Sequence, residues 1–134
     1  MPNGATMKTG PAIEWHSNGE KKSQGAYAAD KREGPWLFWF PTGGPERQGT
    51  YTNGKPEGVW TTYHASGARA SEGQMVNGKE NGPWVYWDDE TVTRTEGAYL
   101  MGDRDGRWVD YGPDDQALRE RVYRAGRLVS QSEL

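Results

Sequence analysis

The chain has 134 residues, a net charge of −3 and no cysteine, so it holds no disulfide and no thiolate ligand for a metal. Leu, Ile, Val and Phe together account for only 15 residues, whereas Gly and Pro account for 27. This composition cannot fill the interior of a Rossmann domain or a helical bundle and cannot sustain long helices, which excludes most enzyme scaffolds.

An internal repeat organises the whole chain. A glycine recurs every 24 residues from Gly10 to Gly106, usually with Trp two residues later and Trp or Tyr five residues later. The seven Trp and seven Tyr indicate a folded chain, because disordered chains are poor in aromatic residues. Residues 1–9 and 130–134 are expected to be tails. The five units between them are 10–33, 34–57, 58–81, 82–105 and 106–129.

Each unit predicts two short strands and two turns. In the second unit, the stretch 36–40 is rich in the aromatic types that favour strands. Thr42-Gly43 predicts the turn within the unit. Asn53-Gly54 predicts a type I′ turn to the next unit, because both residues tolerate positive φ.

The spacing of the turns also predicts which residues face each other. A two-residue loop at 42–43 would place Trp36 directly opposite Gly49, and the same rule pairs Trp60 with Gly73. A glycine in a strand leaves room for the indole of a neighbouring strand to lie across it. We therefore expect each indole to cover the glycine of the strand that follows it.

These features predict an all-β fold. It is a repeat array of β-hairpins that forms an extended, twisted, antiparallel single-layer meander of about ten strands, an open solenoid in which each unit contacts only its neighbours. The sequence contains no stretch of 18 apolar residues and no apolar h-region near its start, so it predicts neither a membrane span nor a signal peptide. A cytoplasmic location is expected, or an exported one if an upstream signal peptide has been removed.

The repeated residues resemble the MORN repeat, in the bacterial variant with a period near 24. The pattern Gly-x-Trp-x-x-Trp/Tyr, then Gly-x-Tyr and Asn-Gly-Lys-x-x-Gly, is carried by segments 34–39, 49–58 and 77–82, and the resemblance covers 10–129. It implies a β-hairpin ribbon that serves as a protein-interaction or scaffolding module, with membrane-lipid binding in some members and an antitoxin label on many bacterial variants. It implies no catalytic residues. Cell-wall choline- and glucan-binding repeats are a weaker match, because their aromatic residues are adjacent rather than three apart.

An aromatic face of the ribbon is the first candidate site. A single layer cannot bury both faces, so some rings must remain accessible, and accessible contiguous rings mark an interface. The most apolar stretch is again 36–40. The candidate partner-binding residues are Trp36, Phe38, Trp39, Phe40, Trp60, Tyr63, Tyr86 and Trp87.

An acidic patch is the second candidate. Residues 82–115 contain nine acids and three bases, which would suit a basic partner protein or would simply keep the ribbon soluble. The residues assigned to this patch are Asp88, Asp89, Glu90, Asp103 and Asp105.

The residue pattern predicts no catalytic, cofactor or metal site. His16 and His64 occupy equivalent positions two units apart, too far to share a metal, and are expected in solvent. The glycines and acids fall on repeat turns, so they indicate neither a phosphate-binding loop nor a catalytic carboxylate pair.

The sequence thus predicts a non-catalytic module that binds a partner protein through an aromatic face. Binding of a glycan or of cell wall by stacked Trp and Tyr is the alternative. Anionic-lipid binding and antitoxin-like neutralisation of a partner rank lower. The near-neutral charge and the scattered basic residues disfavour nucleic acids and membranes as partners.

Overall fold

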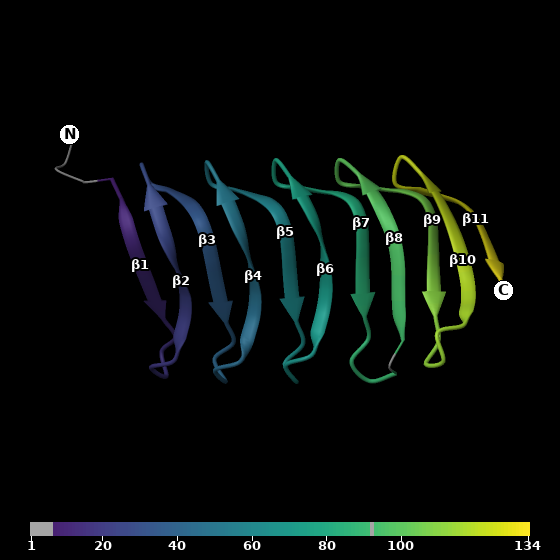
Figure 1. Cartoon of the computed structure of the whole chain (residues 1–134), viewed down its shortest axis with the longest axis horizontal. Coiled ribbons are helices and arrows are strands. Elements are labelled where there is room, and N and C mark those ends of the chain that lie inside the picture. The colour runs from purple at the N-terminus through teal and green to yellow at the C-terminus, as the bar shows by residue number, and fades with distance from the viewer. Residues whose placement is uncertain (1–6, 92) are drawn as a thin grey trace.

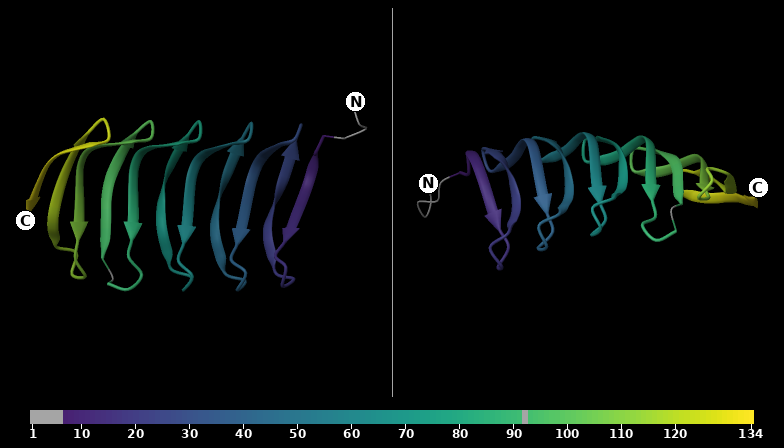
Figure 2. Two further views of the ribbon diagram at one scale, coloured as in Figure 1. Left: turned by 180° about the vertical axis from the view of Figure 1, so that it is seen from behind. Right: turned by 60° about the horizontal axis from the view of Figure 1, so that its bottom comes forward.

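The computed structural model describes residues 7–91 and 93–134, which form one antiparallel sheet with its strands in sequence order (Figure 1). The sheet is an open single layer, seen from two further sides in Figure 2, and the predicted all-β architecture is confirmed. No helix that could cross a membrane occurs in the described ranges. The strands are β1 (Gly10–Trp15), β2 (Lys21–Ala28), β3 (Lys31–Trp39), β4 (Pro45–Thr52), β5 (Lys55–Tyr63), β6 (Arg69–Val76), β7 (Lys79–Trp87), β8 (Arg94–Leu100), β9 (Asp103–Tyr111), β10 (Ala117–Arg124) and β11 (Arg127–Glu133).

The described part of the chain has eleven strands, one more than the ten expected. Ala125 and Gly126, with φ of 51° and 82°, turn the chain back after β10. The following strand β11 pairs with β10, so residues 130–133, which were expected in a tail, belong to the sheet. The repeat therefore continues into the first strand of a sixth unit.

The turns that join successive units are tight, as predicted. Asn53 and Gly54 have φ of 51° and 82°, and they connect Thr52 directly to its cross-strand partner Lys55. Two central residues with positive φ define a type I′ turn, whose twist matches that of the flanking strands. The same conformation recurs at Ala29-Asp30, Asn77-Gly78, Met101-Gly102 and Ala125-Gly126.

The turns within units are one residue longer than predicted. The N–H of Phe40 donates to the carbonyl of Gly44 at 2.8 Å, and Gly43, with φ of 99°, donates back to Phe40 at 2.9 Å. This is a three-residue loop, a type I turn followed by a left-handed residue and a bulge. The bulge shifts the register at Trp39, which pairs with Pro45. It absorbs the extra loop residue, so the predicted pairing is preserved further along the strands.

The fourth unit closes its turn differently, because Thr91 stands where the first three units carry a glycine. The N–H of Asp88 donates to the carbonyl of Thr93 at 2.9 Å. The Asp88 carboxylate accepts the N–H groups of Thr91 and Glu90, which lower the pKa of this carboxyl below its usual value. Asp88 thus organises a longer loop without a left-handed glycine.

The predicted register is confirmed, with Trp36 opposite Gly49 and Trp60 opposite Gly73. The predicted direction of the indoles is wrong. A Cβ on Gly49 would lie 2.2 Å from ring carbons of Trp60, and a Cβ on Gly73 would lie 2.1 Å from the ring of Trp84. Each indole therefore covers the glycine of the strand that precedes it.

A hydrogen bond explains this direction. The indole N–H of Trp60 donates to the carbonyl of Thr50, in the preceding strand, at 3.1 Å. The same bond recurs at intervals of 24 residues at 3.0–3.1 Å and satisfies each indole N–H as its ring is buried. The other three pairs are Trp36 with Ala26, Trp84 with Gln74 and Trp108 with Ala98.

The core is a ladder of rings along one face of the sheet. Trp36 is only 1% exposed. Its ring meets Tyr27 and Tyr51 edge-on, with centroids 5.1 and 6.1 Å away, and stacks on Phe38 at 5.9 Å. Tyr51 in turn meets Trp60 at 5.0 Å. Such pairs add stability beyond the area they bury. A second group of rings in the C-terminal half consists of Trp84, Tyr86, Tyr99, Trp108 and Tyr123.

The ladder has a gap in the third unit. Met75 occupies the position that Tyr holds in the other units and lies between Trp60 and Trp84. Beside it, the hydroxyls of Thr62 and Ser71 form a 2.6 Å hydrogen bond where Phe38 or Tyr86 would supply a ring in the neighbouring units. The two groups of rings therefore meet at a methionine.

Replacing Met75 with tyrosine is expected to stabilise the protein by about 0.5–1.5 kcal/mol for each ring pair formed with the flanking tryptophans. Urea unfolding measures the gain. Met101→Tyr is the matched control, because Met101 is 44% exposed in a turn and should leave the midpoint unchanged. A lower midpoint for Met75→Tyr would show that the third unit has no room for a ring.

Hydrogen bonds between turns join successive units along one edge. The N–H of Gly54 donates to the carbonyl of Arg32 at 3.0 Å, in the unit before. The N–H of Asn53 donates to the carboxylate of Glu33 at 3.0 Å. The backbone bond recurs from Gly78, Gly102 and Gly126. Each turn is thus held by the previous one, which fixes the spacing of the units.

Candidate interaction surface

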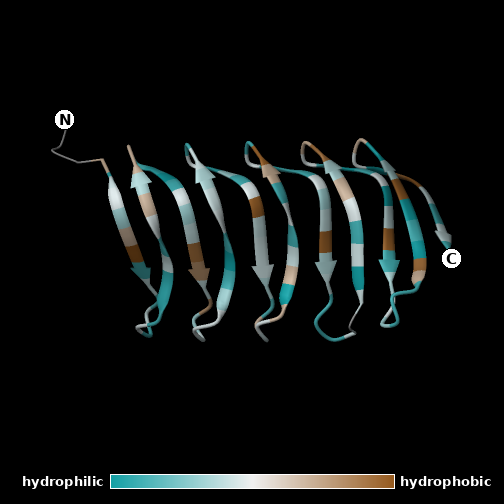
Figure 3. Ribbon diagram, in the orientation of Figure 1, coloured by the Kyte–Doolittle hydropathy of each residue, from teal (hydrophilic) through white to brown (hydrophobic). Residues whose placement is uncertain are grey.

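The two faces of the sheet differ in burial. Alternate residues of a strand point to opposite faces. We call the face with the ring ladder the ladder face, and the other, which carries Leu37 and Trp39 of β3, the open face. Figure 3 shows only narrow hydrophobic bands, because the hydropathy scale ranks the Trp and Tyr of the ladder as weakly polar.

Three of the eight predicted contact rings belong to the ladder face and are buried. Trp36 is 1% exposed, and Phe38 and Trp60 are each 6% exposed. These three rings are not among those that remain accessible, because neighbouring rings cover them within the single layer. The Arg32 guanidinium adds to this cover and lies 5.0 Å from the centre of the Trp36 ring.

The other five predicted rings are half-buried and lie in different places. Trp39, Tyr63 and Trp87 belong to the open face, at the ends of β3, β5 and β7. Phe40 belongs to the turn that follows β3. Tyr86 lies on the ladder face, where burial and the Tyr99 hydroxyl, 2.7 Å away, raise its pKa above the ordinary value. The structure therefore does not gather the eight rings into one surface.

The open face instead presents an apolar patch in the N-terminal half, which we call the open patch. It consists of four exposed side chains from β1, β3 and β5. Ile13 is 44% exposed, Trp15 57%, Leu37 40% and Val59 63%. Exposed apolar side chains that cluster on one face mark a site of interaction.

The repeat position between Ile13 and Leu37 is uncharged in the N-terminal half. Gln24 lies between Ile13 and Leu37, and Gln48 follows Leu37 on the other side. The equivalent positions in the C-terminal half are glutamates. They are Glu72, Glu96 and Glu120. At this repeat position the open face therefore carries amides at one end and glutamates at the other, and each glutamate is paired with an arginine.

A row of rings runs along the open face near the turns within the units. We call it the ring row, and it consists of Trp15, Trp39, Tyr63, Trp87 and Tyr111. Cations from the intervening strands lie over several of these rings. Lys21 Nζ is 5.7 Å from the Trp39 ring centre, and the guanidinium of Arg69 is 4.7 Å from that of Trp87.

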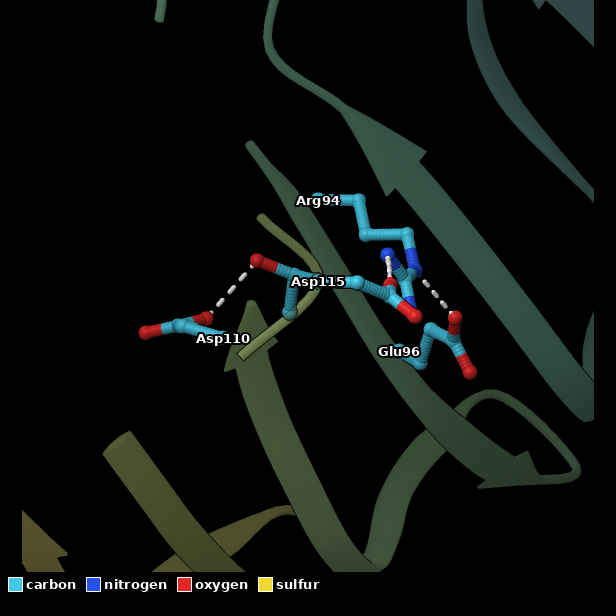
Figure 4. A network of polar contacts seen from close by, with 5 residues as sticks. Arg94, Glu96, Asp110 and Asp115 are labelled. Atoms are coloured by element: carbon cyan, nitrogen blue, oxygen red, sulfur yellow. Dashed lines mark hydrogen bonds and ion pairs between the residues drawn. The ribbon is translucent and has the colours of Figure 1, made fainter. Parts of the chain in front are cut away.

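The C-terminal end of the ring row is bordered by an ion-pair network. Figure 4 shows the Arg94 guanidinium between the carboxylates of Glu96 and Asp115, and hydrogen bonds to both raise the pKa of Arg94. The same guanidinium lies 4.2 Å from the centre of the Tyr111 ring. A hollow of about 480 Å³ opens beside this network and Trp87.

Two segments of the chain, residues 32–53 and 56–77, match the family model of the MORN repeat variant. These two segments are MORN repeats. Repeats of this family generally mediate interactions with proteins or membranes and are typically non-catalytic. No curated protein matches the chain significantly.

The acidic residues predicted as one patch lie at opposite ends of the strands. Asp88, Asp89 and Glu90 are in the turn after β7, whereas Asp103 and Asp105 begin β9. The length of β8, seven residues or roughly 23 Å, separates the two groups. They do not form a single patch, because successive turns of a hairpin ribbon fall on alternate edges.

The two histidines join successive repeat units and are half-buried, so the expectation that they lie in solvent is wrong. His16 Nε2 donates to the carbonyl of Trp39 at 2.8 Å, and His64 Nε2 donates to that of Trp87 at 2.6 Å. Since a carbonyl only accepts, Nε2 carries the proton in both rings. Within the described residues, no three Asp, Glu or His side chains are placed to hold a metal ion.

Proposed function

We propose that this MORN-repeat protein is a non-catalytic interaction module that binds a partner protein through the open patch. One observation carries the proposal: Ile13, Trp15, Leu37 and Val59 are all exposed on the N-terminal half of one face. The ladder face offers a partner little, because its rings are already packed against one another. A rigid sheet also presents the patch without a cost for ordering it.

Affinity capture from the native cells with wild-type protein and with Leu37→Ser/Val59→Ser tests this proposal. Both side chains are at least 40% exposed, so the variant should fold, which its circular dichroism checks. A partner should be retained by wild type and lost by the variant. The matched control is Leu100→Ser/Leu128→Ser, at 61% and 51% exposure outside the patch, which should retain the partner. Equal capture by both variants would contradict the assigned surface.

A further inference from the structure

We infer that Arg32 and Arg47 bind a carboxylate group, presented by an acidic side chain of a partner, on the ladder face. Both guanidinium groups lie beside one ring, since the Cζ atoms of Arg32 and Arg47 are 5.4 and 4.1 Å from the centre of the Phe38 ring. The rings of this face are packed against one another, so the inference concerns the cations that cover them. The site lies on the face opposite the open patch and does not depend on the proposed function.

The two arginines are poorly neutralised. Among the described residues, no carboxylate forms an ion pair with Arg32, and its Nε is buried without an acceptor. The Glu46 carboxylate lies 3.9 Å from Arg47 Nε, and both of these side chains are more than 40% exposed. Two cations beside one ring repel each other. A bound anion would relieve this repulsion.

The fifth unit places a carboxylate at the equivalent position. Asp110 stands where the second unit has Phe38, and its cross-strand partner is Arg119, just as Arg47 is the partner of Phe38. Arg119 Nε lies 3.2 Å from the Asp110 carboxylate, and Arg121 Nη2 donates to the same carboxylate at 2.8 Å. An arginine at this repeat position is thus placed to hold a carboxylate. In the second unit, Phe38 supplies none.

The size of the site indicates what it holds. A hollow of about 160 Å³ opens beside the two arginines and the Phe38 ring. Pockets for small molecules usually measure about 300–1,000 Å³. The hollow is therefore too small for a whole metabolite and suits the end of one side chain.

The charges around the hollow favour a single negative charge on the ligand. Lys22 joins the two arginines on the positive side, and Glu14 and Glu46 also line the hollow. The Glu14 carboxylate accepts a hydrogen bond from a neighbouring serine hydroxyl at 3.3 Å. The two glutamates repel a doubly charged phosphate more strongly than a carboxylate, because Coulomb energy scales with the charge of the ligand.

Titration of protein labelled with ¹⁵N at arginine, followed by the Nε–Hε resonances, tests the inference. The probe is the peptide Gly-Glu-Gly with both ends capped, and capped Gly-Gln-Gly and inorganic phosphate are the comparison ligands. The Arg32 and Arg47 resonances should shift and saturate with the glutamate peptide and stay in place with the glutamine peptide. Arg119 is the internal control and should not shift, because Asp110 already occupies it.

Arg47→Gln is the main variant, because its side chain is 44% exposed and its loss should leave the fold intact. It should weaken binding of the glutamate peptide about tenfold, which corresponds to one charge-assisted hydrogen bond. Arg124→Gln is the matched control, since Arg124 is exposed at the end of β10, and it should leave binding unchanged.

Three results would overturn the inference. If Arg32 and Arg47 only cover the rings through cation–π contacts, their resonances will not move at millimolar glutamate peptide. Equal shifts at Arg119 would show that the peptide acts on all arginines alike. Tighter binding of phosphate than of the glutamate peptide would show that the ligand chemistry is wrong. None of these results bears on capture through Leu37 and Val59, so the proposed function is tested separately.

Discussion

Replacing Gly73 with valine is expected to lower the free energy of unfolding by about 1–3 kcal/mol, because the new side chain would collide with the indole of Trp84. A Cβ on Gly73 would lie 2.1–2.4 Å from three ring carbons. The ring is not free to move away, since its N–H donates to the carbonyl of Gln74 at 3.0 Å. The higher strand propensity of valine, at most about 1 kcal/mol, does not offset this overpacking. Urea unfolding of the two proteins measures the loss.

A double-mutant cycle identifies the ring involved. Trp84→Ala alone should cost roughly 3–5 kcal/mol, and Gly73→Val/Trp84→Ala should cost clearly less than the sum of the single changes. The matched control combines Gly73→Val with Trp60→Ala. Trp60 is the cross-strand partner of Gly73 but its indole lies over Gly49, so its coupling to Gly73 should be weaker than that of Trp84. If an alanine variant does not fold, the corresponding leucine variants replace it in both cycles. Stronger coupling of Gly73 to Trp60 than to Trp84 would contradict the observed packing.

The second large effect is expected at Trp36, the most buried side chain of the ladder. Trp36→Ala should lower the free energy of unfolding by roughly 3–5 kcal/mol. The change removes the ring contacts with Tyr27 and Tyr51 and leaves the carbonyl of Ala26 without its donor. Denaturant unfolding followed by far-ultraviolet circular dichroism provides the measurement.

Trp15→Ala is the matched control, because it removes the same side chain from a position that is 57% exposed. Its cost should stay within about 0.5 kcal/mol, as is usual for surface substitutions. Similar losses for Trp15→Ala and Trp36→Ala would mean that burial in the ladder does not dominate the stability.

Much of the fold follows from the 24-residue period. Asn53-Gly54 specifies a type I′ turn through the φ angles its residues tolerate, and this local chemistry fixes the turn whatever the packing. The pairing of Trp36 with Gly49 also follows from the turn positions. The direction of each indole does not follow from the turn positions. Register decides which backbones are adjacent, but the side-chain torsions and the carbonyl that accepts the indole N–H decide which glycine is covered.

The candidate surface is harder to predict, because the high aromatic content of the stretch 36–40 makes all of it look like an interface. Alternation within that stretch sends Trp36 and Phe38 to one face and Leu37 and Trp39 to the other. How completely a single layer buries its own rings depends on edge-to-face packing, which composition does not reveal. The difference between the two halves of the open face is visible in the sequence as a change from glutamine to glutamate at one repeat position. That series is Gln24, Gln48, Glu72, Glu96 and Glu120.

The methionine gap in the ladder has a consequence for how the ribbon opens. In a repeat array, each unit is stabilised only by contacts with its neighbours. A weak contact between two well-packed groups therefore divides the chain into separate cooperative folding units. Met75 belongs to β6, the strand in which the glutamine of the open face is first replaced by a glutamate, Glu72. A ligand on the open patch would therefore slow amide exchange in β1 to β5 and leave β7 to β11 exchanging as before. The exchange rates of the N-terminal half would then change on binding, and those of the C-terminal half would serve as an internal reference.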